Sequence, residues 1–166
     1  MILQKNNPIL TAENKPIEKI KSLRTSELIK KMSEALLKEP DGIGIAAPQI
    51  GESLRVFLVT SDVLSLEALK DRSKNAPPKI IVFINPTIKK RSVKKSMDIE
   101  GCLSVRGDYG EVIRPEKISI EYYDEFGKKI ARGASGLLAR VIQHEMDHLD
   151  GVLFIDKAKN IKKLEK

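Results

Sequence analysis

The 166-residue sequence predicts a small α+β fold in which strands precede one long helix near the C-terminus. Two observations support this prediction. The middle of the chain contains segments of branched apolar or alternating apolar and polar residues, which are typical of strands. They are followed by GLLARVIQHEMDHL (136–149), whose apolar residues recur with the period of a helix. Because strands and helices do not alternate along the chain, a doubly wound parallel sheet is not expected.

The N-terminal part is expected to form a turn and a helix. After an extended start, Asn6-Asn7-Pro8 predicts the turn. The helix should be capped by Thr25 or Ser26 and continue to about Lys38, where Pro40-Asp41-Gly42 stops it. Its inner face is predicted to consist of Leu28, Ile29, Met32, Leu36 and Leu37.

Two strands are predicted in the next part of the chain. LRVFLVT (54–60) and KIIVFINP (79–86) are rich in branched apolar residues. The polar segment between them, residues 61–78, is expected to be a long connection that carries a helical turn.

A further strand and a hairpin are expected before the last helix. Residues 88–105 predict a strand that leads into a loop. Residues 116–135 alternate in polarity and turn at Asp124–Gly127, which indicates a β-hairpin. Ser135 should then cap the last helix, and Gly151 is placed to end it.

The composition indicates a globular protein of one domain, because 41% of the residues are hydrophobic and 32% are charged. No apolar run approaches the roughly 20 residues that span a bilayer, so no membrane association is expected. The N-terminus does not resemble a signal peptide. A single cysteine forms no internal disulfide, which favours a reducing compartment and predicts a cytoplasmic location.

The formal net charge of +7 comes from short clusters of lysine. A solvated basic surface is the preferred interpretation. Few aromatic residues lie near these clusters and no nucleic-acid motif is visible, so sequence-specific nucleic-acid binding is not expected. Loose attraction to RNA stays open.

Both histidines of the chain lie in QHEMDHLDG (143–151). Residues four apart on a helix lie one turn above each other, so His144 and His148 can bind the same ion. Glu145 is offset by one residue, where it can handle the protons of a water molecule without being a ligand. The same stripe continues to Val141 and Leu137, which places the histidines on the buried or half-buried edge of the helix.

Two imidazoles need further ligands to make a catalytic metal site. Phe154 occupies the position of the third histidine in the extended HExxHxxGxxH pattern, and Glu165 lies too close to the C-terminus to be a good anchor. Asp and Glu are too numerous to choose between by pattern. Cys102, in the constrained setting EGCLS and followed by a turn at Gly107–Gly110, would be a soft ligand. A small buried hydrophobic residue is the alternative for this cysteine.

The glycine-rich segment GIGIAAPQIG (42–51) is not expected to bind a dinucleotide, because it follows a helix and lacks the third glycine of that motif. A turn between helix and strand is the simple interpretation. Gln49 is a lone amide among apolar residues, and it could donate a hydrogen bond to an oxygen held in a cleft.

Taken together, three motifs resemble those of the peptide deformylase family: GIGIAAPQ (42–49), EGCLS (100–104) and QHEMDH (143–148). The resemblance extends over about residues 1–156. It implies antiparallel sheets packed around a central metal-binding helix, in a single catalytic domain of residues 1–166. It also implies hydrolysis of the N-formyl group from the initiator methionine of new polypeptides, with release of formate.

The resemblance implies that Cys102, His144 and His148 bind one divalent metal ion. This ion is typically ferrous iron (Fe2+), which zinc, nickel or cobalt can replace. Glu145 matches the catalytic acid and base. Gln49 matches the side-chain donor to the oxyanion, and the residue whose backbone N–H assists it is matched by Leu103.

The resemblance also implies which residues contact the substrate. Ile43 and Gly44 match the strand that holds the peptide, and Glu100 matches a motif glutamate whose charged partner is Arg114. The methionine side chain is expected near Ile43, Leu137 and Val141. The substrate-binding residues are therefore predicted to be Ile43, Gly44, Glu100, Leu137 and Val141.

N-formylmethionyl nascent peptides are the implied partners, and loose association with the ribosome is left open. The chain departs from the family pattern at Arg106, where proline is common, and at Thr11, where arginine is common. The connection at 61–78 is long, and a short basic tail begins at about residue 157. These departures bear on the rim of the site and on partners, not on the three motifs.

Two other functions are left open by the residues alone. An endopeptidase of the HExxH class would cleave casein-like proteins and gain nothing from a formyl group. A non-catalytic metal-binding or RNA-associated protein would bind without turnover.

Overall fold

The computed structural model describes residues 1–65 and 78–163. In these residues the strands form two antiparallel sheets, in the orders β1-β2-β3-β6-β7 and β4-β5-β8. The first sheet consists of β1 (Gly44–Ala46), β2 (Val56–Thr60), β3 (Ile80–Arg91), β6 (Lys117–Tyr123) and β7 (Lys129–Ser135). The second consists of β4 (Lys95–Cys102), β5 (Val105–Pro115) and β8 (Lys159–Lys163). The predicted α+β class is confirmed.

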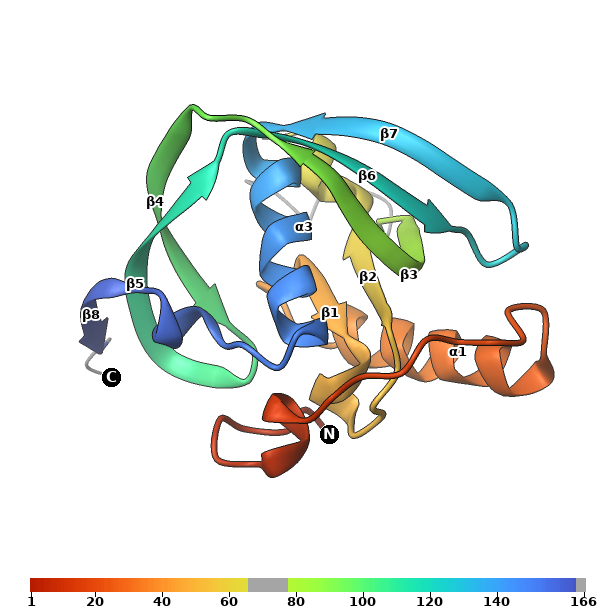
Figure 1. The fold of residues 1–166 in the computed structure, drawn as a ribbon. Coiled ribbons are helices and arrows are strands. Elements are labelled where there is room, and N and C mark those ends of the chain that lie inside the picture. The colour runs from red at the N-terminus through yellow and green to blue at the C-terminus, as the bar shows by residue number, and fades with distance from the viewer. Residues whose placement is uncertain (66–77, 164–166) are drawn as a thin grey trace.

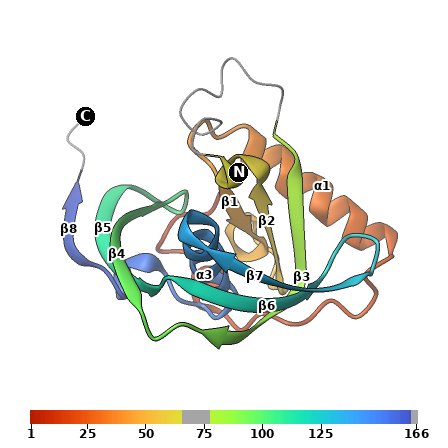
Figure 2. The same cartoon turned by 90° about the horizontal axis from the view of Figure 1, so that it is seen from above.

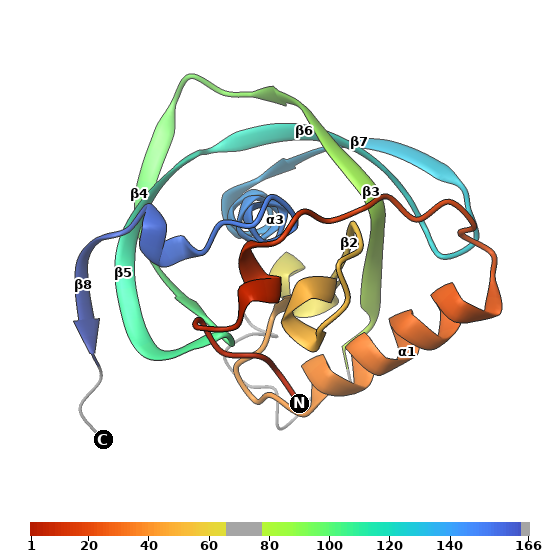
Figure 3. The same ribbon diagram turned by 60° about the horizontal axis from the view of Figure 1, so that its bottom comes forward.

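Helix α3 (Gly136–Leu149) lies between the two sheets (Figure 1). In Figure 3 the helix is seen nearly along its axis, with strands of both sheets around it. Its apolar face contacts the inner face of the larger sheet, where the Phe57 and Phe83 rings stack with centroids 4.6 Å apart. The other side of α3 faces β4 and β5, and this side carries the histidines.

Helix α1 (Leu23–Leu37) covers the outer face of β1, β2 and β3, as Figure 2 shows from above. Strand β2 is therefore buried on both faces, which explains its uninterrupted run of apolar residues. Val56 and Leu58 pack toward α1, whereas Phe57 and Val59 pack toward α3. Two layers of helix thus fix β1, the short edge strand that begins at Gly44.

The hairpin predicted at 116–135 is present as β6 and β7, in register from Lys117↔Ser135 to Tyr123↔Lys129. Both predicted apolar strands are also present, and the second extends beyond residue 86 as β3. The pairing of β3 with β6 shifts in register between Ile84 and Thr87 and again between Ile88 and Lys90. Ser135 is the N-cap of α3, and Gly151 follows its end with φ 71°.

Four short 3₁₀ helices complete the described chain: η1 (Pro8–Thr11), η2 (Ala47–Ile50), η3 (Ser61–Leu64) and η4 (Phe154–Asp156). The predicted turn at Asn6-Asn7-Pro8 is confirmed, since the Asn7 side chain caps η1. The helical turn expected within the connection 61–78 is η3. The remainder of that connection, residues 66–77, lies outside the described residues.

Three expectations were wrong. Helix α1 begins earlier than predicted, because Ser22 caps it by accepting from the Thr25 N–H, and Leu37 is not on its inner face but 49% exposed. The turn expected at Gly107–Gly110 is part of β5, which pairs with β4 along most of its length. Within the basic segment that begins at about residue 157, Lys159–Lys163 form strand β8, which pairs with β5; this strand was not expected, but it does not contradict the prediction of a basic tail. Among the described residues, no helix is long and apolar enough to cross a membrane.

Candidate active site

The two histidines of α3 meet Cys102 at the end of β4. The ligand atoms of Cys102, His144 and His148 all lie within 4.8 Å of one another, and the Cys102 sulfur is 3.2 Å from His148 Nε2. The structure therefore brings Cys102 together with two histidines that lie more than forty positions after it in the sequence.

Where β4 contacts α3, the distance between alternate residues of the strand is close to the rise of one turn of the helix. Glu100 and Cys102 are two residues apart on β4, about 6.6 Å along a strand, and His144 and His148 are one turn apart on α3, about 6 Å. Glu100 accordingly faces His144, and Cys102 faces His148. The strand then ends in a tight hairpin turn, in which Cys102 pairs with Val105.

Gly101, between the two cleft residues of β4, has no room for a side chain. A Cβ atom there would come 2.7 Å from Cε1 of the Tyr109 ring, which lies over this part of β4. The register of β4 and β5 also shifts between Glu100 and Cys102. The glycine of the EGCLS motif therefore lets β5 close over the strand that presents the thiol.

Glu100 fixes the orientation of His144. Its carboxylate accepts two hydrogen bonds from Arg114, of 2.6 and 2.8 Å, and Oε2 lies 3.0 Å from His144 Nδ1. Burial by itself would raise the pKa of Glu100, but the hydrogen bonds from Arg114 and His144 hold it well below its usual range. A carboxylate on Nδ1 leaves Nε2 of the imidazole as the nitrogen that can bind a metal.

Arg114 also connects Glu100 to the next acidic residue of the motif. Its Nη1 donates to Asp147 Oδ2 at 2.9 Å, and Lys157 donates to the other oxygen of Asp147 at 2.6 Å. An ionic chain thus runs from the surface of the protein to His144, and it ties η4, α3 and β5 together.

Two residues of the site, Arg140 and Ser104, were not among those predicted from the sequence. Arg140 donates to Glu100 Oε1 at 2.8 Å, and it could have been found because it lies four residues before His144, on the same face of the helix. Ser104 accepts from the Gln49 amide at 3.1 Å, and its place two residues after Cys102 gave no signal for this contact.

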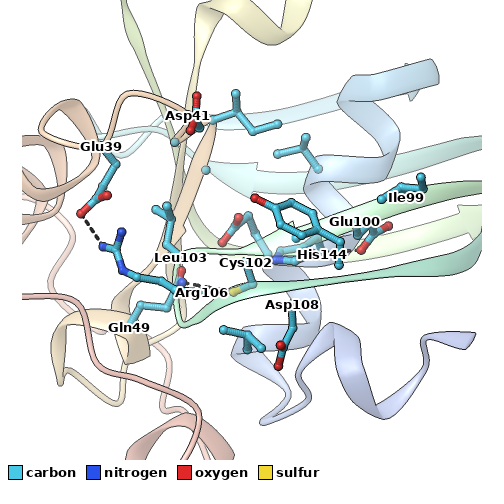
Figure 4. A pocket seen from close by; sticks show the side chains of 18 of the residues that line it. Glu39, Asp41, Gln49, Ile99, Glu100, Cys102, Leu103, Arg106, Asp108 and His144 are labelled. Carbon is cyan, nitrogen blue, oxygen red and sulfur yellow. Dashed lines mark hydrogen bonds and ion pairs between the residues drawn. The ribbon is translucent and has the colours of Figure 1, made fainter. Parts of the chain in front are cut away.

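Gln49 is held with its amide nitrogen toward the thiol. Its Oε1 accepts from the Ala46 N–H at 2.8 Å, so Nε2 must face the opposite way. Nε2 lies 3.6 Å from the Cys102 sulfur, a contact drawn in Figure 4, and it donates to Ser104. Leu103 lies in the hairpin turn directly after Cys102 and lines the same cleft. The amide of Gln49 and the turn that contains Leu103 therefore both lie beside the ligand cluster.

Glu145 is buried beside the ligand cluster with an oxygen that has no hydrogen-bond partner among the described residues. The residue is 3% exposed, and the unpartnered atom is Oε2. A Cβ atom on Gly44 would overlap Glu145 Oε1, so only glycine leaves room for the carboxylate at this point of β1. Burial raises the pKa of Glu145 to about 7, against the opposing effect of the charges on His144 and Arg114.

The metal-free protein should lose stability as the pH rises through the range of this carboxyl. With a pKa of about 7 in the folded chain and an ordinary value of 4.5, Glu145 carries no penalty below pH 4.5. Between pH 4.5 and 7 the unfolded chain releases the proton first, which costs the folded state about 3 kcal/mol by pH 8. Urea unfolding of metal-free Glu145→Gln should therefore show higher stability than wild type at pH 8, and equal stability near pH 4.5. A difference that stays constant with pH would contradict the burial argument.

The two imidazoles have opposite electrostatic settings. Burial would lower the pKa of His144, but the Cys102 sulfur and the Glu100 carboxylate beside it raise the pKa to about 10. Burial lowers the pKa of His148 well below its ordinary value, and charge on His144 adds to this effect. Binding of a cation would have to displace the proton of His144, because a metal ligand must be deprotonated.

A cleft of about 430 Å³ opens onto these residues. One wall comes from the segment before and within β1, the other from the β4–β5 hairpin, and α3 forms the floor. At the rim, Arg106 donates to Glu39 across the two walls at 2.7 Å (Figure 4). The cleft is lined by all the residues predicted to contact substrate: Ile43, Gly44, Glu100, Leu137 and Val141. Thr11 lies away from it in η1, where its hydroxyl donates to Pro8.

The donor set fits a divalent transition metal. One thiol sulfur and two imidazole nitrogens lie within 4.8 Å of one another, and two of the three residues, Cys102 and His144, line the cleft. Softer sulfur and borderline nitrogen donors suit iron, zinc, nickel and cobalt, and not calcium or magnesium. The unpartnered Glu145 oxygen beside them is where a catalytic water would be met.

Comparison with known proteins identifies the family. The family model described as polypeptide deformylase matches residues 1–164. A peptide deformylase of Chlorobaculum parvum is 42% identical over 152 residues, which cover 92% of this chain and 75% of the relative. One of Treponema pallidum is 40% identical over 151 residues, which cover 90% of this chain and 82% of the relative.

Solved structures agree. The crystal structure of the peptide deformylase from Thermotoga maritima has a TM-score of 0.82 at 32% identity, and covers 96% of this chain and 97% of its own. That of a probable peptide deformylase from Synechococcus phage S-SSM7 has a TM-score of 0.82 at 35% identity, with 95% and 98% covered. The chain therefore belongs to the polypeptide deformylase family, whose members are metal-dependent hydrolases that remove the N-formyl group from newly made polypeptides.

Proposed function

We propose that this cleft is the catalytic site for deformylation, with one divalent metal ion held by Cys102, His144 and His148. The observation that carries the proposal is the convergence of their ligand atoms within 4.8 Å beside the unpartnered oxygen of Glu145. The HExxH motif does not require this protein to be an endopeptidase. Membership of the polypeptide deformylase family explains the motif, because the substrate of that family is a formylated peptide.

Ferrous iron is the ion we expect in the native protein, with zinc, nickel or cobalt as substitutes. The thiol of Cys102 favours such ions over hard cations. When bound, the ion would supply the positive charge that makes a water molecule acidic near neutral pH. Glu100, with Arg114, would hold His144 in the tautomer that this requires.

Glu145 would move the proton of the reaction. Its carboxylate lies next to the ligand cluster and is offset from the histidines, so it would take a proton from the attacking water. It would then return this proton to the amine that leaves as the formyl C–N bond breaks. Burial, which raises the pKa of this carboxyl in the metal-free chain, would favour its holding the proton between the two steps.

Gln49 and Leu103 would stabilise the negative charge that develops on the formyl oxygen. The Ala46 N–H holds Oε1 of Gln49, so Nε2 faces Ser104 and the Cys102 sulfur, beside the place where the formyl oxygen would lie. The backbone N–H of Leu103, in the turn after Cys102, would be the second donor. The Gln49 side chain is held in place before substrate arrives, but its Nε2 donates to Ser104, so one of these donor contacts would have to be exchanged for the formyl oxygen.

The apolar part of the cleft would take the methionine side chain. Ile43, Leu137 and Val141 line it, and the absence of a side chain at Gly44 lets strand β1 lie close to Glu145. Glu100 also lines the cleft, but its oxygens already accept from Arg114, Arg140 and His144. We therefore assign Glu100 to orienting His144, and not to direct contact with substrate.

The substrates would be nascent chains, so we place the reaction in the cytoplasm at the ribosome. The net charge of +7 is compatible with loose attraction to ribosomal RNA. No described feature requires a sequence-specific contact with nucleic acid.

Formate release from formyl-Met-Ala-Ser tests the proposal. The protein should be loaded with iron without oxygen, or with nickel, and assayed beside casein and unformylated Met-Ala-Ser. We expect one formate for each formyl peptide, dependence on added metal, and no cleavage of casein. Cleavage of casein with no formate would instead support an endopeptidase, and binding of metal without either product would support a non-catalytic protein.

Replacing Gln49 with leucine should lower kcat by roughly 10²–10³, the usual loss for one oxyanion donor. The change in KM should be small, because full negative charge is present on the oxygen only in the transition state. The measurement is steady-state kinetics on a formyl-methionyl peptide, with metal content determined in parallel. A change confined to KM would mean that Gln49 only helps substrate to bind.

A further inference from the structure

Arg140 is a buried charge on the histidine face of α3. It is 8% exposed and lines the cleft, although a charged side chain is costly to bury unless it is paired and hydrogen-bonded. The contacts that compensate this cost all lie on β4 and β5, the two strands opposite the helix.

One guanidinium group reaches both strands. Its Nη1 donates to Glu100 Oε1 at 2.8 Å and to the Val112 carbonyl at 2.9 Å. Its Nη2 donates to the Ser96 carbonyl at 2.9 Å and contacts the Ser96 hydroxyl at 3.3 Å. Helix α3 is thus fastened to β4 at two places and to β5 at one.

The contacts of Arg140 belong to the same row of contacts between α3 and β4 as those of the two histidines. Along α3, Arg140, His144 and His148 lie on successive turns, and along β4 their partners are Ser96, Glu100 and Cys102. The metal ligands come from both elements, one from β4 and two from α3. The distance between the two elements therefore sets the distance between the sulfur and the imidazole nitrogens.

Arg140 also completes the set of donors on Glu100. A carboxylate has about four lone-pair sites. Arg114 fills one on each oxygen, His144 lies on Oε2, and Arg140 fills the remaining place on Oε1. With every site in use, the carboxylate has no alternative partner to rotate toward, and Oε2 stays on His144.

We propose that Arg140 is a positioning residue of the metal centre, which holds α3 against the β4–β5 hairpin and keeps Glu100 on His144. This inference rests on the proposed metal site. Under this proposal Arg140 controls metal affinity and ligand geometry. A residue that only stabilised the fold would affect neither.

The test uses cobalt-loaded protein and the variant Arg140→Met, which keeps the length of the side chain and removes its donors. Cobalt affinity is measured by competition with a chelator, and the visible spectrum reports ligand geometry. We expect affinity to fall about 10- to 100-fold, as for other residues that support a metal ligand, with a changed spectrum. Arg140→Lys should lose less, because an ammonium can still reach Glu100 but cannot serve both strands.

Gln143→Met is the matched control. Gln143 is also on α3, 5% exposed, and donates to the Pro115 carbonyl of β5 at 3.0 Å, but it does not touch Glu100. Both methionine variants should lose unfolding stability in urea, and only Arg140→Met should lose cobalt affinity.

Unchanged affinity and spectrum in Arg140→Met, or an equal loss in Gln143→Met, would overturn the proposal. If Arg140→Met does not fold, Arg140→Lys decides in its place, and wild-type affinity and spectrum in that variant would overturn it. Failure of the wild-type protein to bind cobalt would instead show that the metal site itself is wrong.

Discussion

Glu145→Gln should keep about one metal ion per chain and lower kcat by about 10²–10⁴, the usual contribution of general acid–base catalysis. The substitution keeps the size of the side chain and removes its basicity. Glu145 is offset from the histidines on α3 and its Oε2 has no partner among the described residues, so the side chain is placed to meet water and not to bind the ion. The measurements are metal analysis and formate release on the same samples.

Two further variants sharpen this test. Glu145→Asp keeps the carboxylate but withdraws it by about 1.5 Å, enough to impair proton transfer to a fixed water, so its activity should be intermediate. Glu125→Gln, in the exposed turn between β6 and β7, should behave as wild type. Loss of metal from Glu145→Gln would make Glu145 a ligand, and full activity would place the base elsewhere.

Cys102→Ala should lose the metal and, with it, deformylation. The thiol is one of three ligand atoms, so its removal should weaken binding by more than the 10–100-fold caused by loss of a supporting residue. Metal content after gel filtration and formate release with saturating nickel are the measurements. Far-UV circular dichroism of the metal-free variant controls for folding, because Cys102 is partly buried against the apolar cluster that contains Val105 and Phe154.

A Cys102→Ala protein that holds one tightly bound ion and releases formate normally would contradict the assignment. A carboxylate would then have to complete the site, and Glu145 is the candidate we would test, because it is buried and its Oε2 has no partner among the described residues. The double variant Cys102→Ala/Glu145→Gln would lose the ion if Glu145 completes the site, and would keep it if another carboxylate does.

The sequence was most informative where one element carries the pattern. Spacing within one helix placed His144, His148 and Glu145 correctly relative to one another, because helical geometry relates residues four apart without knowledge of the rest of the fold. The β6–β7 hairpin was also predictable, because alternation and a turn signal are both local.

Contacts between distant elements were less accessible. Nothing in the spacing of Cys102 pairs it with α3, and the three-motif resemblance had to supply that ligand. Arg140 was overlooked because an arginine on a helix is usually solvated, and its burial depends on where β4 and β5 lie. Strand β8 was missed since its residues are exposed and lysine-rich, so pairing with β5 and not burial forms it.

The start of α1 shows a smaller error of the same kind. Its first residue, Leu23, is 75% exposed, so apolar periodicity does not mark the beginning of the helix. The cap at Ser22 depends instead on a hydrogen bond to the Thr25 N–H, which several serine and threonine residues nearby could have made.

The proposed metal ligands lie on two elements, the end of β4 and the helix α3, and this arrangement would link metal supply to the lifetime of the chain. The complete ligand set exists only when the helix is docked on the hairpin, so the ion binds the folded state in preference to any partly open one. A ligand present at 100 times its Kd stabilises the state that it binds by about 2.7 kcal/mol. A cell short of metal would therefore hold a larger open population, in which α3 is exposed to proteases. Degradation would then remove chains that never acquired an ion, and the enzyme's abundance would follow the metal available to it.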